Sequence, residues 1–498
     1  MSNSLPILNR WQQLPVTVIA AVTSLLFTLL VVWQHPVLND DAYGYLRAAA
    51  LFQTDGPSTV FADYGWYSYS ILIGVADYLL PGDLLAAARV LNALLQGLLI
   101  VAFVQTSSIL HGERYRWLAA LTILLFPLFN EMRFFLIRDF GFWAFVMVSL
   151  WQLLRFGESS RWQHAMLFAL ALAVATSFRL EALLLAVLAP LGLVGTGRSR
   201  TVAMLYAMLL ALAALVALLC LSLQLDLLAL MQYAYRYYLP RANDLGNMLP
   251  DAARAVMQQL FTDDNYPGND NTFIGLIIVL VGYGISMLAS LIKALGVPVS
   301  LLVAHALWRG WLTAGPRWRG PLAAYALGAL LSLFAFVSIM HFLTQRYATL
   351  LCLLLLLQLP PVLDRWHQQL SARWPLHRAL YAFAFCYFLV DSLFSFGHSM
   401  QHIPLAAHWL RDSLSTADGL LTNSPYLAYA SGRVDRYDEA RLSVTDTLAL
   451  ITPATPLALE LKASDTTVRA MLDANPRLQL LQRFANDHGD EVRIYQVQ

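Results

Sequence analysis

The chain has 498 residues, of which 58% are hydrophobic and 13% are charged, and its formal net charge at pH 7 is +1. Soluble globular proteins carry about 25% charged residues, so this composition excludes an ordinary soluble enzyme and indicates an α-helical polytopic membrane protein. The sequence contains no Walker loop, GxGxxG, CxxC or HExxH motif. We therefore expect no nucleotide cofactor, and we expect the lipid bilayer rather than a nucleic acid as a partner.

Apolar runs of about 17–25 residues predict about eleven transmembrane helices. They lie near residues 15–33, 86–108, 117–130, 140–154, 163–178, 180–195, 201–225, 288–308, 321–341, 347–363 and 379–397. The apolar stretch 273–308 is longer than one crossing needs, so we assign 273–287 to a surface or re-entrant piece. The first external loop, 34–84, and a long external loop, 226–272, complete a membrane module over residues 1–397.

Arginines gather in every second connection between these spans. The connections are those that hold Arg114 and Arg116, Arg155 and Arg161, Arg198 and Arg200, Arg309, Arg317 and Arg319, and Arg365, Arg373 and Arg378. Short cytoplasmic loops carry an excess of Lys and Arg. The pattern therefore places the N-terminus inside and the aspartate-rich first loop outside.

The composition changes near residue 398 to that of a soluble domain. Ser424-Pro425 predicts a helix start, and residues 466–474 predict a second helix. Residues 420–422 and 448–451 predict short strands, and 478–483 and 492–497 predict two more strands that flank a hairpin at 486–490. We expect a small α/β domain, 398–498, on the external face.

Two adjacent carboxylates, Asp40 and Asp41, follow directly on the first span. Asn39 or Asp40 can cap a helix that starts here, and Tyr43 begins an apolar stripe at helical spacing. In the simplest interpretation the two aspartates only cap and solubilise a loop.

Four more places put ionisable groups at the external ends of spans, where they are costly unless paired or functional. These are Glu131 and Arg133 with Arg138-Asp139, Arg179 with Glu181, Arg236 with Arg241, and His341 with Arg346 and Tyr347. Each also has a simpler role. Arg179 and Glu181 can form a buried structural pair, Arg346 can reach to the interface, and His341 can be a satisfied polar residue.

Several of these motifs together resemble the GT-C membrane glycosyltransferases. They are Asp40-Asp41-Ala42-Tyr43 after the first span, Arg138-Asp139 at the fourth, Arg179-Leu180-Glu181, and the closing soluble region. The superfamily includes the protein O-mannosyltransferases of glycosyltransferase family 39 and the lipid A aminoarabinose transferase. The chain departs from many relatives in having Asp-Asp where they have Asp-Glu, and in lacking a His-Pro-Pro in the first loop.

The resemblance implies a transferase that moves a hexosyl or pentosyl group from a polyprenyl-phosphate donor to a hydroxyl of a glycan, lipid or protein. It implies Asp40 or Asp41 as general base and Asp139 as a group that orients the base or a metal. Arg138, Arg179, Arg236 and Arg346 would bind the donor phosphate, with Tyr43, Glu131, Glu181, His341 and Tyr347 in support. The resemblance also implies a bacterial inner membrane, with the active site and the C-terminal domain facing the periplasm. Whether a divalent cation takes part is left open.

A carboxylate can take the acceptor's proton, and arginine forks suit a departing phosphate. Three alternatives remain at this point. One is a non-enzymatic assembly subunit of an envelope complex that uses the C-terminal domain as a docking module. An O-antigen polymerase or ligase has a large external loop with arginines, but it needs no aspartate pair after the first span. A lipid-linked-sugar transporter would be expected to carry ionisable residues at mid-span and repeated halves.

Overall fold

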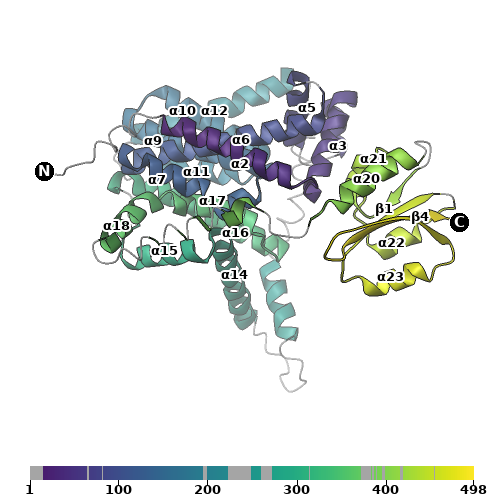
Figure 1. Cartoon of the computed structure of the whole chain (residues 1–498). Coiled ribbons are helices and arrows are strands. Elements are labelled where there is room, and N and C mark those ends of the chain that lie inside the picture. The colour runs from purple at the N-terminus through teal and green to yellow at the C-terminus, as the bar shows by residue number, and fades with distance from the viewer. Residues whose placement is uncertain are drawn as a thin grey trace. The chain divides into compact units, whose positions relative to one another are not determined.

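The computed structural model describes residues 15–63, 67–80, 82–194, 199–222, 248–259, 272–312, 315–371, 379, 383, 386–387, 390–394, 399–414, 419–453 and 455–498 (Figure 1). The chain forms two compact units. The first consists of residues 1–25, 94–130 and 138–392, and the second of residues 26–93, 131–137 and 393–498. The predicted division at residues 397 and 398 stays a prediction.

Among the described residues, six helices are long and apolar enough to cross a membrane. They are α2 (Val16–Gln34), α6 (Leu84–His111), α9 (Asp139–Ser159), α12 (Ser199–Ser222), α14 (Thr272–Leu295) and α16 (Pro316–Met340). Helices α17 (Gln345–Leu356) and α18 (Leu359–Ser371) together form one more candidate, bent by 58°. The predicted helical, multi-span fold class is confirmed. The count of eleven stays a prediction, because the span at 379–397 lies mostly outside the described residues.

Shorter apolar helices account for several of the other predicted spans. They are α10 (Trp162–Phe178), α11 (Ala182–Leu191) and α15 (Val297–Trp308). A further short apolar helix, α5 (Tyr67–Leu79), lies within the predicted external loop 34–84. The predicted span at 117–130 is instead two pieces, α7 (Arg116–Leu124) and α8 (Pro127–Glu131). Proline lacks a backbone N–H and clashes with the preceding turn, so Pro127 begins a new helix rather than continuing the old one.

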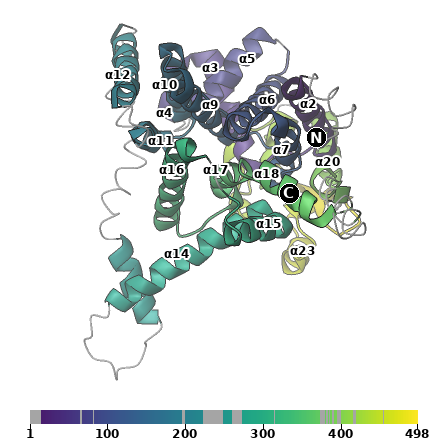
Figure 2. The same cartoon turned by 90° about the vertical axis from the view of Figure 1, so that its left-hand side faces the viewer.

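The prediction that residue 287 ends one element and residue 288 begins the next was wrong. Helix α14 runs without interruption through both positions, and the break falls at Gly296 (Figure 2). Gly296 has a φ of 76°, a conformation that favours glycine, and a proline follows in the first turn of α15. The backbone preferences of these two residues, rather than the length of the apolar run, decide where the helix stops.

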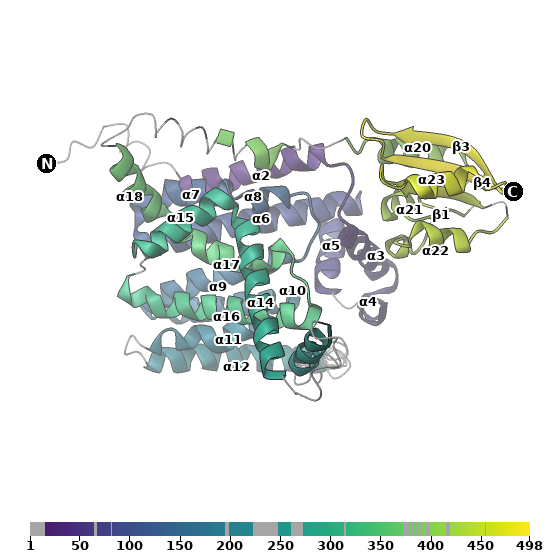
Figure 3. The same cartoon turned by 90° about the horizontal axis from the view of Figure 1, so that it is seen from below.

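In the first unit α9 packs against α10, α11 against α16, and both α14 and α16 against α17 (Figure 3). The start of α9 meets the end of α10 at Gly141, where a Cβ atom would overlap the ring of Phe178. Small residues let apolar helices approach closely. This approach brings the residues that flank Gly141 and Phe178 together, which are Asp139 and Arg179.

The C-terminal part of the second unit is a four-stranded sheet in the order β1-β2-β4-β3. The strands are β1 (Leu421–Thr422), β2 (Pro456–Leu461), β3 (Leu478–Ala485) and β4 (Glu491–Val497). Strand β1 is parallel to β2, and β4 is antiparallel to both β2 and β3. Helices α20 (His402–Ser413) and α21 (Pro425–Ser431) cover one face, and α22 (Val444–Ala449) and α23 (Thr466–Asp473) cover the other. The predicted α/β character and the hairpin at 486–490 are confirmed.

The predicted strand at 448–451 was wrong, because residues 444–449 form α22. The Ser443 side chain accepts a hydrogen bond from the backbone N–H of Asp446, 3.1 Å away, and so caps the helix. Ser-x-x-Asp is a variant of the capping-box pattern, so a helix start could have been recognised in the sequence. The strand that pairs with β1 lies instead at 456–461.

Candidate functional site

A buried guanidinium holds two carboxylates in the first unit. Arg179 lies between α10 and α11, and its Nη1 donates to Oδ1 of Asp139 at the start of α9. Its Nη2 and Nε both donate to Oε1 of Glu181, at 2.5 and 3.1 Å. The side chains of Arg179 and Asp139 are only 8% and 6% exposed. The structure contains the Arg179–Glu181 ion pair that the sequence analysis left open as one alternative, and Asp139 joins it.

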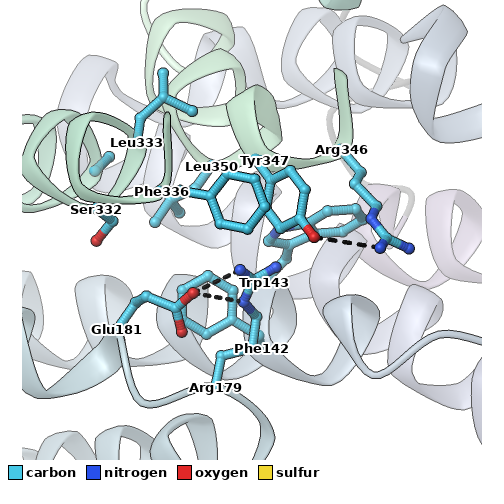
Figure 4. A pocket seen from close by; sticks show the side chains of 11 residues that line it. Phe142, Trp143, Arg179, Glu181, Ser332, Leu333, Phe336, Arg346, Tyr347 and Leu350 are labelled. Atoms are coloured by element: carbon cyan, nitrogen blue, oxygen red, sulfur yellow. Dashed lines mark hydrogen bonds and ion pairs between the residues drawn. The ribbon is translucent and has the colours of Figure 1, made fainter. Parts of the chain in front are cut away.

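Aromatic rings enclose the same guanidinium. The Cζ atom of Arg179 lies 5.5 Å from the ring centroid of Phe142 and 4.9 Å from that of Tyr347. Tyr347 in turn stacks on Phe336, with ring centroids 3.6 Å apart. A cation over an aromatic face is attracted by the ring quadrupole. The arginine therefore joins α9, α11 and α17 through its charge and its planar surface together (Figure 4).

These residues line a small pocket that is partly open to solvent. Its polar lining consists of Arg179, Glu181, Arg346, Tyr347 and Ser332, and its apolar lining is Phe142, Trp143, Ala329, Leu333, Phe336 and Leu350. Nη2 of Arg346 donates to the hydroxyl of Tyr347, 3.3 Å away. Mixed linings of this kind, with a few converging polar groups, are typical of ligand sites.

One oxygen of this pocket is shielded from solvent without a hydrogen bond. Oε2 of Glu181 accepts no hydrogen bond from the described residues, whereas Oε1 accepts from Arg179. Arg138, the residue before α9, also interacts electrostatically with Glu181. A buried polar atom without a partner costs about 1–3 kcal/mol. Glu181 therefore holds acceptor capacity that a bound molecule with a hydroxyl or ammonium group would use.

His341 does not line this pocket. It ends α16 with a φ of 56°, which is uncommon outside glycine. Its Nδ1 lies 3.0 Å from the hydroxyl of Tyr283 in α14. The histidine is exposed, and its predicted supporting role stays a prediction.

The aspartate pair belongs to the second unit, where α3 (Asp40–Asp55) begins with it. Asn39 occupies the N-cap position, but its side chain makes no cap hydrogen bond. Instead, Oδ1 of Asn39 accepts from the N–H of Leu136 at 2.8 Å and Nδ2 donates to the carbonyl of Leu136 at 3.5 Å. Asp40 is exposed and Asp41 is half-buried. Negative charge at a helix N-terminus is stabilised by the helix dipole.

Tyr43, Glu131 and Arg133 differ in their surroundings. Tyr43 is buried on α3, and this burial raises the pKa of its hydroxyl above the ordinary value. Glu131 is exposed at the end of α8. Arg133 is fully buried, and its Nη1 donates to the hydroxyl of Thr28 at 3.0 Å. Arg133 therefore serves the packing of the second unit. The predicted phosphate ligand Arg236 lies outside the described residues.

Sequence analysis missed Trp143, Ser332 and Phe336, which line the pocket. Each lies inside an apolar helix, where nothing in the local pattern separates it from neighbours that face lipid. Among the described residues, no group of three or more His, Cys, Asp or Glu side chains could hold a metal ion.

No family model and no curated protein matches the chain. It is similar to the oligosaccharyltransferase of Archaeoglobus fulgidus in its complex with Zn and sulfate, with 16% identity and a TM-score of 0.48, over 80% of this chain and 55% of that one. For the apo form of that enzyme the identity is 14% and the TM-score is 0.46, over 80% of this chain and 58% of that one. The chain is also similar to ArnT from Cupriavidus metallidurans bound to undecaprenyl phosphate, with 13% identity and a TM-score of 0.41, over 96% of this chain and 97% of that one. The chain thus spans little more than half the length of the archaeal enzyme. The functional proposal therefore rests on the site residues and not on these similarities.

Proposed function

We propose that the chain is a membrane glycosyltransferase that moves a sugar from a polyprenyl-phosphate donor to a hydroxyl acceptor on the extracytoplasmic face. The observation that supports this most is the pocket of the first unit. It combines Arg346, the Arg179–Glu181 pair and aromatic walls within a bundle of apolar helices. A lipid phosphate needs a cation beside an apolar approach, and a sugar ring needs aromatic faces and hydrogen-bond acceptors.

Arg346 is our proposed ligand of the donor phosphate. Its guanidinium lines the pocket, and its Nη2 donates a hydrogen bond to the hydroxyl of Tyr347. Arginine binds phosphate through two parallel N–H groups and keeps its charge in apolar surroundings. Arg179 already donates to two carboxylates, so we assign it to hold Asp139 and Glu181 in place.

Asp40 is our proposed general base. It is the exposed member of the aspartate pair, so an acceptor hydroxyl can reach its carboxylate. In the proposed step the acceptor oxygen attacks C1 of the sugar and the bond between C1 and the phosphate oxygen breaks. The hydroxyl proton passes to Asp40. The polyprenyl phosphate leaves with an additional negative charge, which a cationic group can stabilise.

Binding tests the phosphate assignment. Native mass spectrometry of the full chain in nanodiscs, with undecaprenyl phosphate as the probe, should show a loss of about tenfold or more in affinity for Arg346→Ala. Arg346→Lys should lose less, because a lysine keeps the charge but not the fork. Arg309→Ala is the matched control, since Arg309 is exposed and lies over Trp308. Equal binding by all variants would contradict the assignment.

Release of lipid phosphate tests the transfer. Membranes with the full chain are supplied with undecaprenyl-phosphate-linked glucose, galactose, mannose or aminoarabinose, and the undecaprenyl phosphate formed is measured. Wild type should release it from at least one donor, and Asp40→Asn should release about a hundredfold less. Unchanged release by both Asp40→Asn and Asp41→Asn would rule out a base in this pair. No release from any donor would leave a polymerase, ligase or transporter as the better hypothesis.

A further inference from the structure

The C-terminal domain contacts the helix that carries the aspartate pair at several points, all within the second unit. Nε of Arg47 on α3 lies 2.5 Å from Oδ1 of Asp438 in the 3-10 helix η3 (Tyr437–Glu439). The two side chains are 13% and 12% exposed. Ion pairs with so little access to water are weakly screened, and loss of one partner leaves a charge without compensation.

A second contact reaches the backbone of Asp40 itself. Nη2 of Arg441 donates to the carbonyl oxygen of Asp40. The same carbonyl lies in the first turn of α3. In an α-helix it also accepts a hydrogen bond from the N–H four residues further on, which is that of Gly44. A carbonyl has two lone pairs and can accept both bonds. Arg441 therefore fixes the peptide group that directly precedes Asp41.

Aromatic rings extend the same interface. The ring centroids of Tyr43 and Tyr429 are 5.9 Å apart, and those of Tyr429 and Tyr437 are 5.1 Å apart. Tyr43 and Arg47 are four residues apart, so they lie on one face of α3. That face meets α21 and η3, which come from the far end of the chain.

The other side of Asp40 is anchored as well. Asn39 makes both of its side-chain hydrogen bonds to Leu136, in the segment 131–137. The aspartate pair thus lies between Asn39, which holds a connection between membrane helices, and Arg441, which belongs to the C-terminal domain. None of these three hydrogen bonds involves a carboxylate of the aspartate pair.

We infer that Asp438 and Arg441 are positioning residues, through which the C-terminal domain sets the place and direction of the Asp40–Asp41 carboxylates. The catalytic meaning of this inference rests on the proposed function, whereas the contacts themselves do not. The C-terminal domain would then be a working part of the active site rather than a separate module for docking.

Amide hydrogen exchange of the full chain in nanodiscs tests the contacts without any substrate. In Arg441→Ala and Asp438→Asn, amides 44–47 should exchange at least about tenfold faster than in wild type, because each variant removes a contact that holds α3, at Asp40 or at Arg47 respectively. Arg436→Ala and Glu439→Gln are matched controls from the same segment. That pair is 64% and 54% exposed and lies 2.9 Å apart. Unchanged exchange in both test variants would overturn the inference.

Kinetics separates positioning from simple stability. In Arg441→Ala, kcat for release of undecaprenyl phosphate should fall about 10- to 100-fold while KM for the donor changes less than about twofold, since a shift of about 1 Å in a reacting group has this effect. Arg441→Lys should recover most of kcat, because an ammonium group can also donate to the carbonyl of Asp40. A fall in active protein with kcat and KM unchanged would overturn the positioning role.

The two proposals can fail independently. Faster exchange in Arg441→Ala, with no release by wild type from any donor, would sustain the contacts and remove the proposed function. The opposite outcome is that release depends on Asp40 while Arg441→Ala and Asp438→Asn both keep the wild-type kcat and exchange rates. That outcome would support the proposed function and rule out the positioning role.

Discussion

Replacement of Arg179 by methionine keeps the length of the side chain and removes its charge. The substitution leaves Asp139 and Glu181 facing each other across a buried space. Their side chains are 6% and 24% exposed, so water compensates little of the lost charge at Asp139 and only part at Glu181.

The expected cost follows from these contacts. Removing one partner of a buried ion pair costs about 3–5 kcal/mol, and the lost contacts with the rings of Phe142 and Tyr347 add about 1–2 kcal/mol. The total of about 4–7 kcal/mol corresponds to a drop in Tm of roughly 8–20 °C, at about 2–3 °C per kcal/mol for a chain of this size.

The assay is thermal unfolding of the full chain in detergent. Arg155→Met on α9 is the matched control, because Arg155 and Glu158 are 3.9 Å apart and 44% and 37% exposed, and such a pair contributes less than about 1 kcal/mol. The triple variant Arg179→Met, Asp139→Asn, Glu181→Gln should recover most of the lost Tm, because no charge remains buried. Equal shifts in Arg179→Met and Arg155→Met would refute the reasoning.

Three further predictions concern local features. Gly141→Ala should lower Tm by several degrees and weaken undecaprenyl phosphate binding, because a Cβ would overlap the facing ring of α10, whereas Gly97→Ala on α6 meets open space and should raise Tm slightly. Ser443→Ala should cost about 1 kcal/mol and speed hydrogen exchange in α22 alone, since it removes the cap; unchanged exchange there would contradict the capping role. The pKa of Asp490 is lowered, chiefly by the hydrogen bond from the N–H of Ala463. The stability that Asp490 contributes is therefore present above the ordinary pKa of an aspartate and is lost as the pH falls through the folded-state pKa, so the 486–490 hairpin should loosen in acid. Asp490→Asn should abolish this pH dependence of the amide exchange rates, after correction for intrinsic exchange.

Most membrane helices could be predicted from the sequence, because a bilayer demands long apolar runs and the runs that become α2, α9 and α10 have clear ends. The break at Gly296 could not be read from hydropathy, since it depends on a φ of 76° within an unbroken apolar stretch. Likewise α22 depends on one side-chain cap at Ser443, which outweighs the strand propensity of the residues that follow.

The candidate site was partly predictable for the same physical reason. Arg179 and Arg346 stand out because a charge next to apolar spans must have a partner or a purpose. Phe336 and Trp143 carry no such signal, because aromatic residues are ordinary in these helices. The bond from Arg441 to Asp40 joins residues 401 positions apart, and a single sequence contains no local pattern that connects them.

That separation also bears on biosynthesis. At about 5–20 residues per second, roughly 20–80 s pass between the synthesis of Asp40 and that of Arg441. During this time helix α3 is present in a nascent protein that still lacks its contact with Arg441. A message that stops before codon 441 would therefore yield an inserted but immature product, and quality control of this protein would have to act after translation ends.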